Sequence, residues 1–341
     1  MKSMPFFAAA ALAGLVGLPA AASAQELVLG AFGGSFADNV KACYIEPFEA
    51  ETGASVLVKL GSSSQHAASV RATAGSSDMD VVFADDAFAV QLKNEDLLNT
   101  LDRTKLSHAE EIVDGAWGKD DAYVAAMVGA TAIVYNPEKI SEPPTSWNDL
   151  FDEKYAGRVA IGDISGTTGW QFLAAVNAME GGTLDNIDPG IAKIKPLAKS
   201  AVLLYTQADQ VVSLFERGEI DIAVWYPDRA GVAMQKGLSL AVAYPKEGAV
   251  AIRPTISIPK GTQNIDLAHK FIDTVLDAEN QKCFSERQYI GAVNRNVTLS
   301  EDVAAIVPSG ETVEKMMYLD PAVMSQKLPE WTRRWQREVL R

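Results

Sequence analysis

Residues 220–229 read IDIAVWYPDR, an apolar run that ends in two aromatic residues, a proline and an acid–base pair. A short run rich in Val and Ile is typical of a strand buried on both faces of an α/β sheet. Such a strand would deliver Trp225 and Tyr226 at its carboxyl end, followed by Asp228 and Arg229. Aromatic rings and a carboxylate together suit an organic ammonium ion, through cation–π contact and a charged hydrogen bond. The alternative interpretation is a core Trp225 beside an Asp–Arg pair on the surface.

Short apolar runs of the same kind recur along the chain and alternate with amphipathic stretches. They predict further strands at 27–29, 56–58, 81–83, 132–135, 159–161, 202–205, 240–244 and 255–258. Apolar residues at helical spacing mark the segments 36–48, 168–180, 209–217 and 264–276 as helices. Alternating strands and helices predict an α/β protein with parallel-rich sheets. So many strands require two sheets, and we expect the joins near Asn136, where a proline-rich stretch begins, and near Arg253.

Composition and the N-terminal segment limit the class of protein. The 341 residues carry 30 Lys and Arg against 44 Asp and Glu, and an acidic chain without basic runs poorly suits nucleic acid or an anionic membrane. Residues 1–24 are predicted to be a secretory signal peptide, because an apolar stretch after Lys2 ends in small residues at 22–24. Export would place Cys43 and Cys283 in an oxidising compartment, where they form either a disulfide or two buried free thiols.

Motifs for catalysis and for metal binding are absent from the sequence. Its three histidines form no HExxH motif, and no CxxC pair or His/Cys cluster provides zinc or redox ligands. There is no GxSxG elbow and no GxxxxGK[ST] phosphate loop. A carboxylate pair of the glycosidase type is the open alternative, but nothing in the sequence selects one. We therefore expect a binding protein without cofactor or metal, not an enzyme.

Ligands in open α/β sheets bind beyond the carboxyl ends of the strands, so residues that follow the predicted strands are candidate site residues. Two glycines and Ser35 follow strand 27–29 and would either bind a carboxylate or phosphate or form a plain capped turn. Two adjacent acids follow strand 81–83 and would bind a cation or cap a helix. Arg253 would clamp a carboxylate if it faces the cleft. The candidate set is Phe32, Gly34, Ser35, Ser63, Asp85, Asp86, Thr131, Thr167, Thr168, Tyr205, Trp225, Asp228 and Arg253.

Several segments together resemble the periplasmic solute-binding proteins of ABC importers, and in particular the spermidine/putrescine-binding group. They are 80–86 (DVVFADD), 129–136 (GATAIVYN), 144–150 (PTSWNDL), 218–228 and 244–249 (YPKEGA). Each segment is a weak signal alone, but their order and spacing extend over nearly all of the chain after residue 24.

This resemblance implies a type II periplasmic-binding-protein fold, in which two lobes close around one ligand by hinge motion. Each lobe would be a mixed, mostly parallel sheet flanked by helices, with crossover strands between the lobes. Lobe one would comprise residues 25–136 and 253–341, and lobe two residues 137–252. The resemblance also implies a monomer in the periplasm that delivers its ligand to an inner-membrane permease with its ATPase.

The resemblance bears on the ligand as well. Trp225 and Asp228 match the Trp and the amine-binding Asp of polyamine receptors, but Arg253 and the 165–168 stretch (SGTT) stand where those receptors carry acids. A second ammonium group would therefore meet a guanidinium group in a desolvated cleft. We predict a ligand with one ammonium and one carboxylate, such as 4-aminobutyrate. Asp228 and Trp225 would hold the ammonium, and Arg253 with the 33–35 turn would hold the carboxylate.

Other ligands and functions remain as alternatives. The nearest is a polyamine receptor, in which Asp85 or Asp86 would replace the lost acids. A receptor for ferric ion would carry paired tyrosines in the second lobe, whereas Tyr205 and Tyr226 stand apart in the sequence. A receptor for another anion, a secreted enzyme and a periplasmic chaperone or adhesin are the remaining alternatives.

Overall fold

The computed structural model describes residue 1 and residues 25–304, 306–307 and 315–341, so the predicted signal peptide lies almost wholly outside the described residues. Every strand predicted from an apolar run overlaps an observed strand, and the short strands β4, β10 and β12 are additional. The strands are β1 (Glu26–Ala31), β2 (Ser55–Leu60), β3 (Val81–Asp85), β4 (Val124–Ala125), β5 (Met127–Tyr135), β6 (Val159–Gly162), β7 (Leu203–Tyr205), β8 (Ile222–Trp225), β9 (Ala241–Ala243), β10 (Val250–Ile252), β11 (Pro254–Ser257) and β12 (Gly291–Ala292).

The strands form two sheets, and each contains a parallel block. In the first sheet β1 pairs in parallel with β2 and β3, and in the second β6 pairs in parallel with β7 and β8. Among the described strands, every antiparallel pair involves β5 or β11. Both sheets are therefore mixed. Their antiparallel strands β5 and β11 are the two that directly follow a strand of the other sheet in the chain. The strand orders are β2-β1-β3-β11-β4 and β10-β5-β8-β6-β7, with β9 and β12 also pairing with β5.

Helices flank both sheets and include every helix predicted from the apolar spacing. No helix within the described ranges is both long enough and apolar enough to cross a lipid bilayer. The helices are α1 (Ser35–Val40), the π-helical turn η1 (Lys41–Ile45), α2 (Glu46–Thr52), α3 (Ser63–Ala72), α4 (Asp86–Asn94), α5 (Thr167–Met179), α6 (Asp188–Ser200), α7 (Asp209–Glu216), α8 (Pro227–Gln235), α9 (Ile265–Leu276), α10 (Ala278–Gln288), α11 (Glu301–Ala304) and α13 (Pro321–Glu338).

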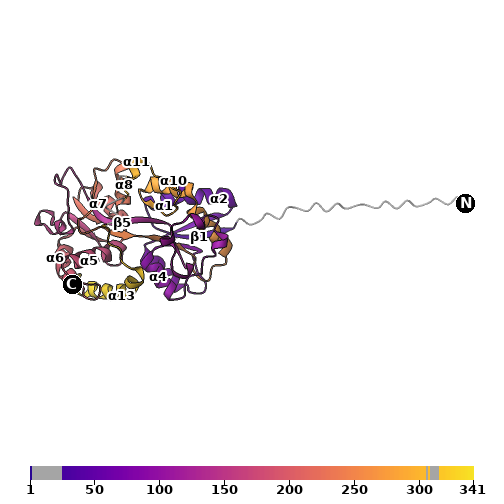
Figure 1. Ribbon diagram of the computed structural model, residues 1–341, viewed down its shortest axis with the longest axis horizontal. Helices are drawn as coiled ribbons and strands as arrows, with labels where there is room; N and C mark the ends of the chain where they lie inside the picture. The colour runs from indigo at the N-terminus through magenta and orange to yellow at the C-terminus, as the bar shows by residue number, and fades with distance from the viewer. Residues whose placement is uncertain (2–24, 305, 308–314) are drawn as a thin grey trace.

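The chain passes directly from one sheet to the other at two points. β4 of the first sheet leads through Ala126 into β5 of the second, and β10 of the second leads through Arg253 into β11 of the first. Figure 1 shows β5 between the half that carries β1, here lobe one, and the half that carries α5 and α6, here lobe two. The first crossing lies before the predicted join near Asn136, because β5 pairs only within the second sheet among the described strands. The second crossing falls at Arg253, where the sequence places a boundary.

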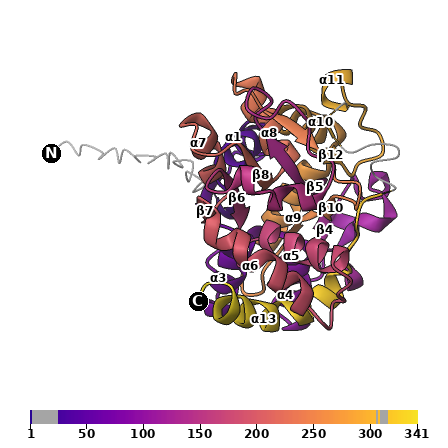
Figure 2. The same cartoon turned by 90° about the vertical axis from the view of Figure 1, so that its left-hand side faces the viewer.

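The C-terminal helix α13 connects the lobes a third time, although the sequence places it in lobe one. It packs against α4 of lobe one and α6 of lobe two (Figure 2). Arg334 on α13 donates a hydrogen bond to Asp188 at the start of α6, with 2.7 Å between Nη2 and Oδ1. Trp331 and Trp335 on α13 are buried in the core. Any hinge motion of the lobes must therefore also move or release α13.

Cys43 on η1 and Cys283 on α10 form a disulfide with their Cα atoms 5.7 Å apart, so the two cysteines are not free thiols. The bond joins residues that are 240 apart in the sequence. Both elements belong to lobe one, where α10 packs against α1 and η1. The disulfide therefore ties the start of lobe one to the segment that returns to it after lobe two.

Removal of this disulfide is expected to destabilise the protein. Closing so long a loop removes chain entropy from the unfolded state, worth on the order of 5 kcal/mol in the loop-entropy model. The variant Cys43→Ser/Cys283→Ser should therefore unfold at a clearly lower denaturant concentration than the oxidised wild type. The reduced wild type is the matched control and should unfold with the double variant. Equal midpoints for the variant and the oxidised protein would contradict the prediction.

Candidate functional site

A cleft lies between the two lobes, at the carboxyl ends of the parallel strands of both sheets. It encloses about 790 Å³, including the part open to solvent. Lobe one lines it with the turn after β1, the turn after β2 and the end of β3. Lobe two lines it with the turn after β6, the turn after β7 and the first residues of α8. Carboxyl ends of parallel strands meet at one edge of a sheet, which explains why turns distant in the sequence converge here.

The cleft contains about half of the residues that the sequence nominates. Those that line it are Phe32, Ser63, Asp85, Thr167, Thr168, Tyr205 and Asp228. Of these, Tyr205 and Thr168 have hydrogen-bond partners within the protein. The Tyr205 hydroxyl oxygen lies 2.8 Å from Oγ1 of Thr168 and 2.7 Å from the Val224 carbonyl oxygen. The nominated residues that do not line the cleft are Gly34, Ser35, Asp86, Thr131, Trp225 and Arg253.

The expected position of Trp225 is wrong. Its side chain is fully buried in the core of lobe two, and its indole N–H donates to the Ala208 carbonyl oxygen at 3.1 Å. Successive residues of a strand point to opposite faces, so Trp225 and Tyr226 face opposite ways at the end of β8. Tyr226 is therefore the aromatic residue that lines the cleft.

The expected position of Arg253 in the cleft is also wrong. Arg253 lies in a separate hollow of about 240 Å³ beside the crossover between β10 and β11, together with Asp86 and Tyr123. Its Nε donates to Asp86 Oδ2 at 2.9 Å. Burial raises the pKa of Asp86, and the Arg253 charge opposes that rise. The adjacent acids separate because Asp85 ends β3 in an extended conformation, whereas Asp86 is the first residue of α4.

The other nominated residues outside the cleft have structural partners. Thr131 is fully buried on β5, and its hydroxyl donates to Gln171 Oε1 at 2.5 Å. Gly34 has a φ of +62°, and a Cβ atom at this position would lie 2.0 Å from Oδ1 of Asp209. The glycine is therefore required because the carboxylate of lobe two approaches the turn of lobe one so closely.

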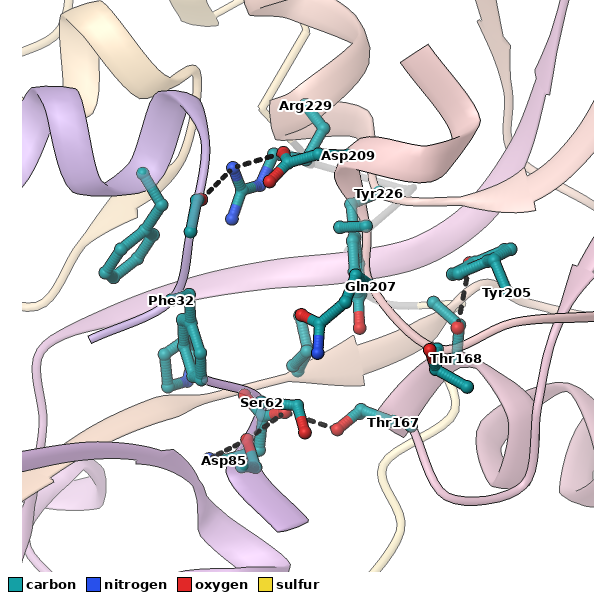
Figure 3. Close-up of a pocket in the computed structure, with 18 of the residues that line it drawn as sticks. Phe32, Ser62, Asp85, Thr167, Thr168, Tyr205, Gln207, Asp209, Tyr226 and Arg229 are labelled. Atoms are coloured by element: carbon teal, nitrogen blue, oxygen red, sulfur yellow. Dashed lines mark hydrogen bonds and ion pairs between the residues drawn. The ribbon is translucent and has the colours of Figure 1, made fainter. Parts of the chain in front are cut away.

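The cleft residues that the sequence did not nominate include Arg229, Tyr226, Asp209 and Gln207, and Arg229 is the one cation among them. Its side chain on α8 is only 6% exposed and lines the cleft. Its Nη1 donates across the cleft to the Gly33 carbonyl oxygen at 3.0 Å and to Ser35 Oγ at 3.1 Å. Asp209 Oδ1 lies 3.5 Å from the same nitrogen (Figure 3). Its place at the carboxyl end of a buried strand, next to Asp228, was the signal that could have found it.

The two buried carboxylates of the cleft have different surroundings. Asp228 Oδ2 accepts a hydrogen bond from Gln288 Nε2 at 2.9 Å and lies 3.8 Å from Nε of Arg229. Burial raises its pKa, and Arg229 opposes the rise. Asp85 Oδ2 accepts hydrogen bonds from the hydroxyls of Ser63 and Thr167. Burial raises the pKa of Asp85 to about 6, against these two hydrogen bonds.

Hydrogen bonds across the cleft join the lobes around it. Besides the Arg229 contacts, Thr167 of lobe two reaches Asp85 of lobe one, and Gln288 of lobe one reaches Asp228 of lobe two. Gln207 Nε2 donates to Gln65 Oε1 at 3.0 Å at the exposed rim. The cleft is thus in a closed arrangement, in which charged groups of each lobe bind neutral polar groups of the other.

No group of three or more His, Cys, Asp and Glu side chains in the described part of the chain is placed to hold a metal ion. The cleft instead offers one guanidinium group, three carboxylates and four aromatic residues, Phe32, Phe36, Tyr205 and Tyr226. Such a lining can pair with charges on a small polar molecule and enclose a short hydrocarbon chain.

Two lobes with a polar cleft between them are typical of a solute-binding protein. Residues 43–307 match the family of bacterial extracellular solute-binding proteins, and the chain belongs to this family. It is 25% identical to the spermidine/putrescine-binding periplasmic protein of Salmonella typhimurium, over 80% of this chain and 81% of that protein. It is equally 25% identical to the gamma-aminobutyric acid-binding protein of Pseudomonas aeruginosa, over 89% of this chain and 84% of that protein.

The fold agrees with a solved periplasmic binding protein of A. tumefaciens in complex with agropinic acid. The two structures superpose with a TM-score of 0.81 at 21% identity, over 93% of this chain and 99% of that one. The two-lobe α/β fold expected from the sequence is therefore confirmed, as is the membership of the solute-binding family.

Proposed function

We propose that the protein is a periplasmic receptor for a small solute that carries one ammonium and one carboxylate group, such as 4-aminobutyrate. The observation that carries this proposal is Arg229, a buried guanidinium group in a cleft that is otherwise acidic. A carboxylate fits such a group through bidentate hydrogen bonds. The acids of the cleft suit an ammonium group, and Phe32 and Tyr226 suit the hydrocarbon chain between the two charges. The gamma-aminobutyric acid-binding relative supports the same ligand class.

The assignment of the carboxylate partner differs from the one expected from the sequence. Arg229 takes the role that Arg253 was expected to play, and Tyr226 takes the place of Trp225 as an aromatic wall. The expected pairing of unlike charges at the two ends of the ligand is kept. Figure 3 supports this arrangement, because Arg229 and Asp85 lie at opposite ends of the drawn cleft with Phe32 and Gln207 between them.

A polyamine is the second candidate, favoured by the excess of acids over bases in the cleft. Asp85, Asp209 and Asp228 stand against Arg229 alone among the residues that line it. The spermidine/putrescine-binding relative supports this ligand class. Arg229 argues against it, because one end of a diamine would lie beside a buried guanidinium group.

Titration calorimetry of the ligand-freed protein with 4-aminobutyrate, putrescine, spermidine and butyrate separates the candidates. We expect 4-aminobutyrate to bind tightly and putrescine and butyrate to bind much more weakly, because each lacks one of the two charges. Tight binding of putrescine without a response to 4-aminobutyrate would overturn the proposal in favour of a polyamine receptor. Native mass spectrometry of the protein as purified would identify a retained ligand.

The place of the protein in transport is part of the proposal. The predicted signal peptide and the family support export to the periplasm, delivery of the solute to an ABC importer permease, a monomer and the absence of catalysis. Release by osmotic shock of a chain that begins at Gln25 would test the location. Turnover of any solute in the panel would contradict the assignment as a receptor.

A further inference from the structure

We propose that Asp85 binds the ammonium group of the ligand, in a subsite that Thr167 completes when the lobes close. This inference rests on the proposed function and deepens it, because it names the residue that selects an amine. It also distinguishes Asp85 from Asp228, the acid that the sequence favours for this role.

Asp85 lines the cleft and carries an unsatisfied hydrogen-bond acceptor. The residue is 4% exposed, and its Oδ2 accepts hydrogen bonds from Ser63 and Thr167. Its Oδ1 is buried and has no hydrogen-bond partner among the described residues. An unpaired buried acceptor is costly, and the cost is higher for a carboxylate. A ligand N–H group at Oδ1 would remove this cost, so the site is built for a donor that the protein does not supply.

The other acids near the cleft already have cationic partners. Asp228 and Asp209 both lie within 4 Å of Arg229, and Asp209 is in addition 45% exposed. Asp86 pairs with Arg253 in the rear hollow. No Lys, Arg or His nitrogen of the described chain forms an ion pair with Asp85. Asp85 is therefore the acid whose charge a bound ammonium group would balance.

The two hydroxyls that hold Asp85 come from different lobes. Ser63 lies at the start of α3 in lobe one, and its Oγ also accepts the Asp85 backbone N–H at 3.0 Å. Thr167 is the first residue of α5 in lobe two. With Oδ2 fixed by both hydroxyls, Oδ1 remains for the ligand. The orientation of the carboxylate thus depends on lobe closure, which couples ammonium binding to the closed state.

The unpaired acceptor suits an ammonium group that carries at least one N–H. In Figure 3 Asp85 lies beside Ser62 and Thr167 at the end of the drawn cleft opposite Arg229. Burial raises the pKa of Asp85 to about 6, which is the behaviour of a carboxylate that lacks its counter-ion. A trimethylated ammonium group keeps the positive charge but has no N–H to donate.

The test measures the affinity of wild type and variants for 4-aminobutyrate by titration calorimetry. Asp85→Asn should weaken binding by about 100-fold, because the ligand charge loses its counter-ion. Thr167→Val, in the other lobe, should weaken it by roughly tenfold through loss of one positioning hydrogen bond. Asp86→Asn is the matched control and should stay within about threefold. Wild type should bind the trimethylated analogue at least about tenfold more weakly than 4-aminobutyrate.

Asp85→Asn should unfold no more easily than wild type, since burial already favours the neutral side chain. Unchanged affinity in Asp85→Asn together with a loss in Asp228→Asn would overturn the inference and leave the proposed function standing. Equal affinity of wild type for the trimethylated analogue would also overturn it, whether or not the variants fold. Failure of wild type to bind 4-aminobutyrate and putrescine alike would overturn the proposed function and the inference together.

Discussion

Replacement of Arg229 by glutamine is expected to weaken 4-aminobutyrate binding by about 100-fold, which corresponds to about 2.7 kcal/mol. The ligand carboxylate would lose a charged, bidentate partner in a site shielded from water, and such losses typically cost 2–5 kcal/mol or more. Calorimetry would measure the change. The same variant leaves Asp228 and Asp209 without their guanidinium partner. Affinity for putrescine should therefore rise while affinity for 4-aminobutyrate falls.

Arg253→Gln provides the matched control for this experiment. It too removes a guanidinium group that pairs with a buried acid, but the pair lies in the rear hollow beside the crossover strands. We expect its affinity for 4-aminobutyrate to remain within about threefold of wild type, as for changes that do not touch the ligand. The reverse outcome, with loss in Arg253→Gln and none in Arg229→Gln, would return the anion site to the position expected from the sequence.

Affinity for an amine is expected to fall by about tenfold between pH 7 and pH 5. Asp85 binds an ammonium group only when it is ionised, and burial raises its pKa in the ligand-free protein to about 6. Protonation in this range therefore competes with the ligand, one proton displaced for each ammonium bound. The free energy of unfolding depends on pH in the opposite direction. A carboxyl group whose pKa is raised in the folded state destabilises that state as pH rises through 4 to 6, so the ligand-free protein should gain stability in acid from this group.

Other groups near Asp85 do not reverse this pH dependence. The pKa of Asp228 is also raised by burial, so its protonation acts in the same direction. The pKa of His66 is lowered by burial, so its ring stays neutral through more of the range. The titratable groups that interact electrostatically with Asp85 are Asp86, Asp228 and Tyr226.

Calorimetric titrations from pH 5 to pH 8 in buffers of equal ionic strength would measure the pH profile. Asp85→Asn supplies the control, since its residual affinity should depend much less on pH. A wild-type profile that is flat below pH 7 would contradict a neutralised Asp85 in the ligand-free state. An affinity that rises in acid would contradict the binding of a cation altogether.

Features set by neighbouring residues could be predicted from the sequence. The Val- and Ile-rich runs at 81–83 and 222–225 identify strands because their side chains must be buried on both faces of a sheet. An Asp-Pro pair is a typical helix start, and α13 begins at Asp320-Pro321, where the Asp320 carboxylate accepts the Ala322 N–H at 2.8 Å. The expectation that polar turns after the strands form one cleft also follows from local pattern, given the rule for parallel sheets.

The sequence by itself therefore determined that this is an α/β chain with two sheets and a polar cleft at their strand ends. Only the tertiary structure decided which charges meet there. Asp85 and Asp86 are indistinguishable as neighbours in the sequence, yet one faces the cleft and the other pairs with Arg253 behind it. Arg229 and Arg253 each follow an apolar run, and only the first reaches the cleft. The physical reason is that the direction of a side chain depends on where the strand ends and how the lobes pack, and contacts between residues far apart in the chain determine both.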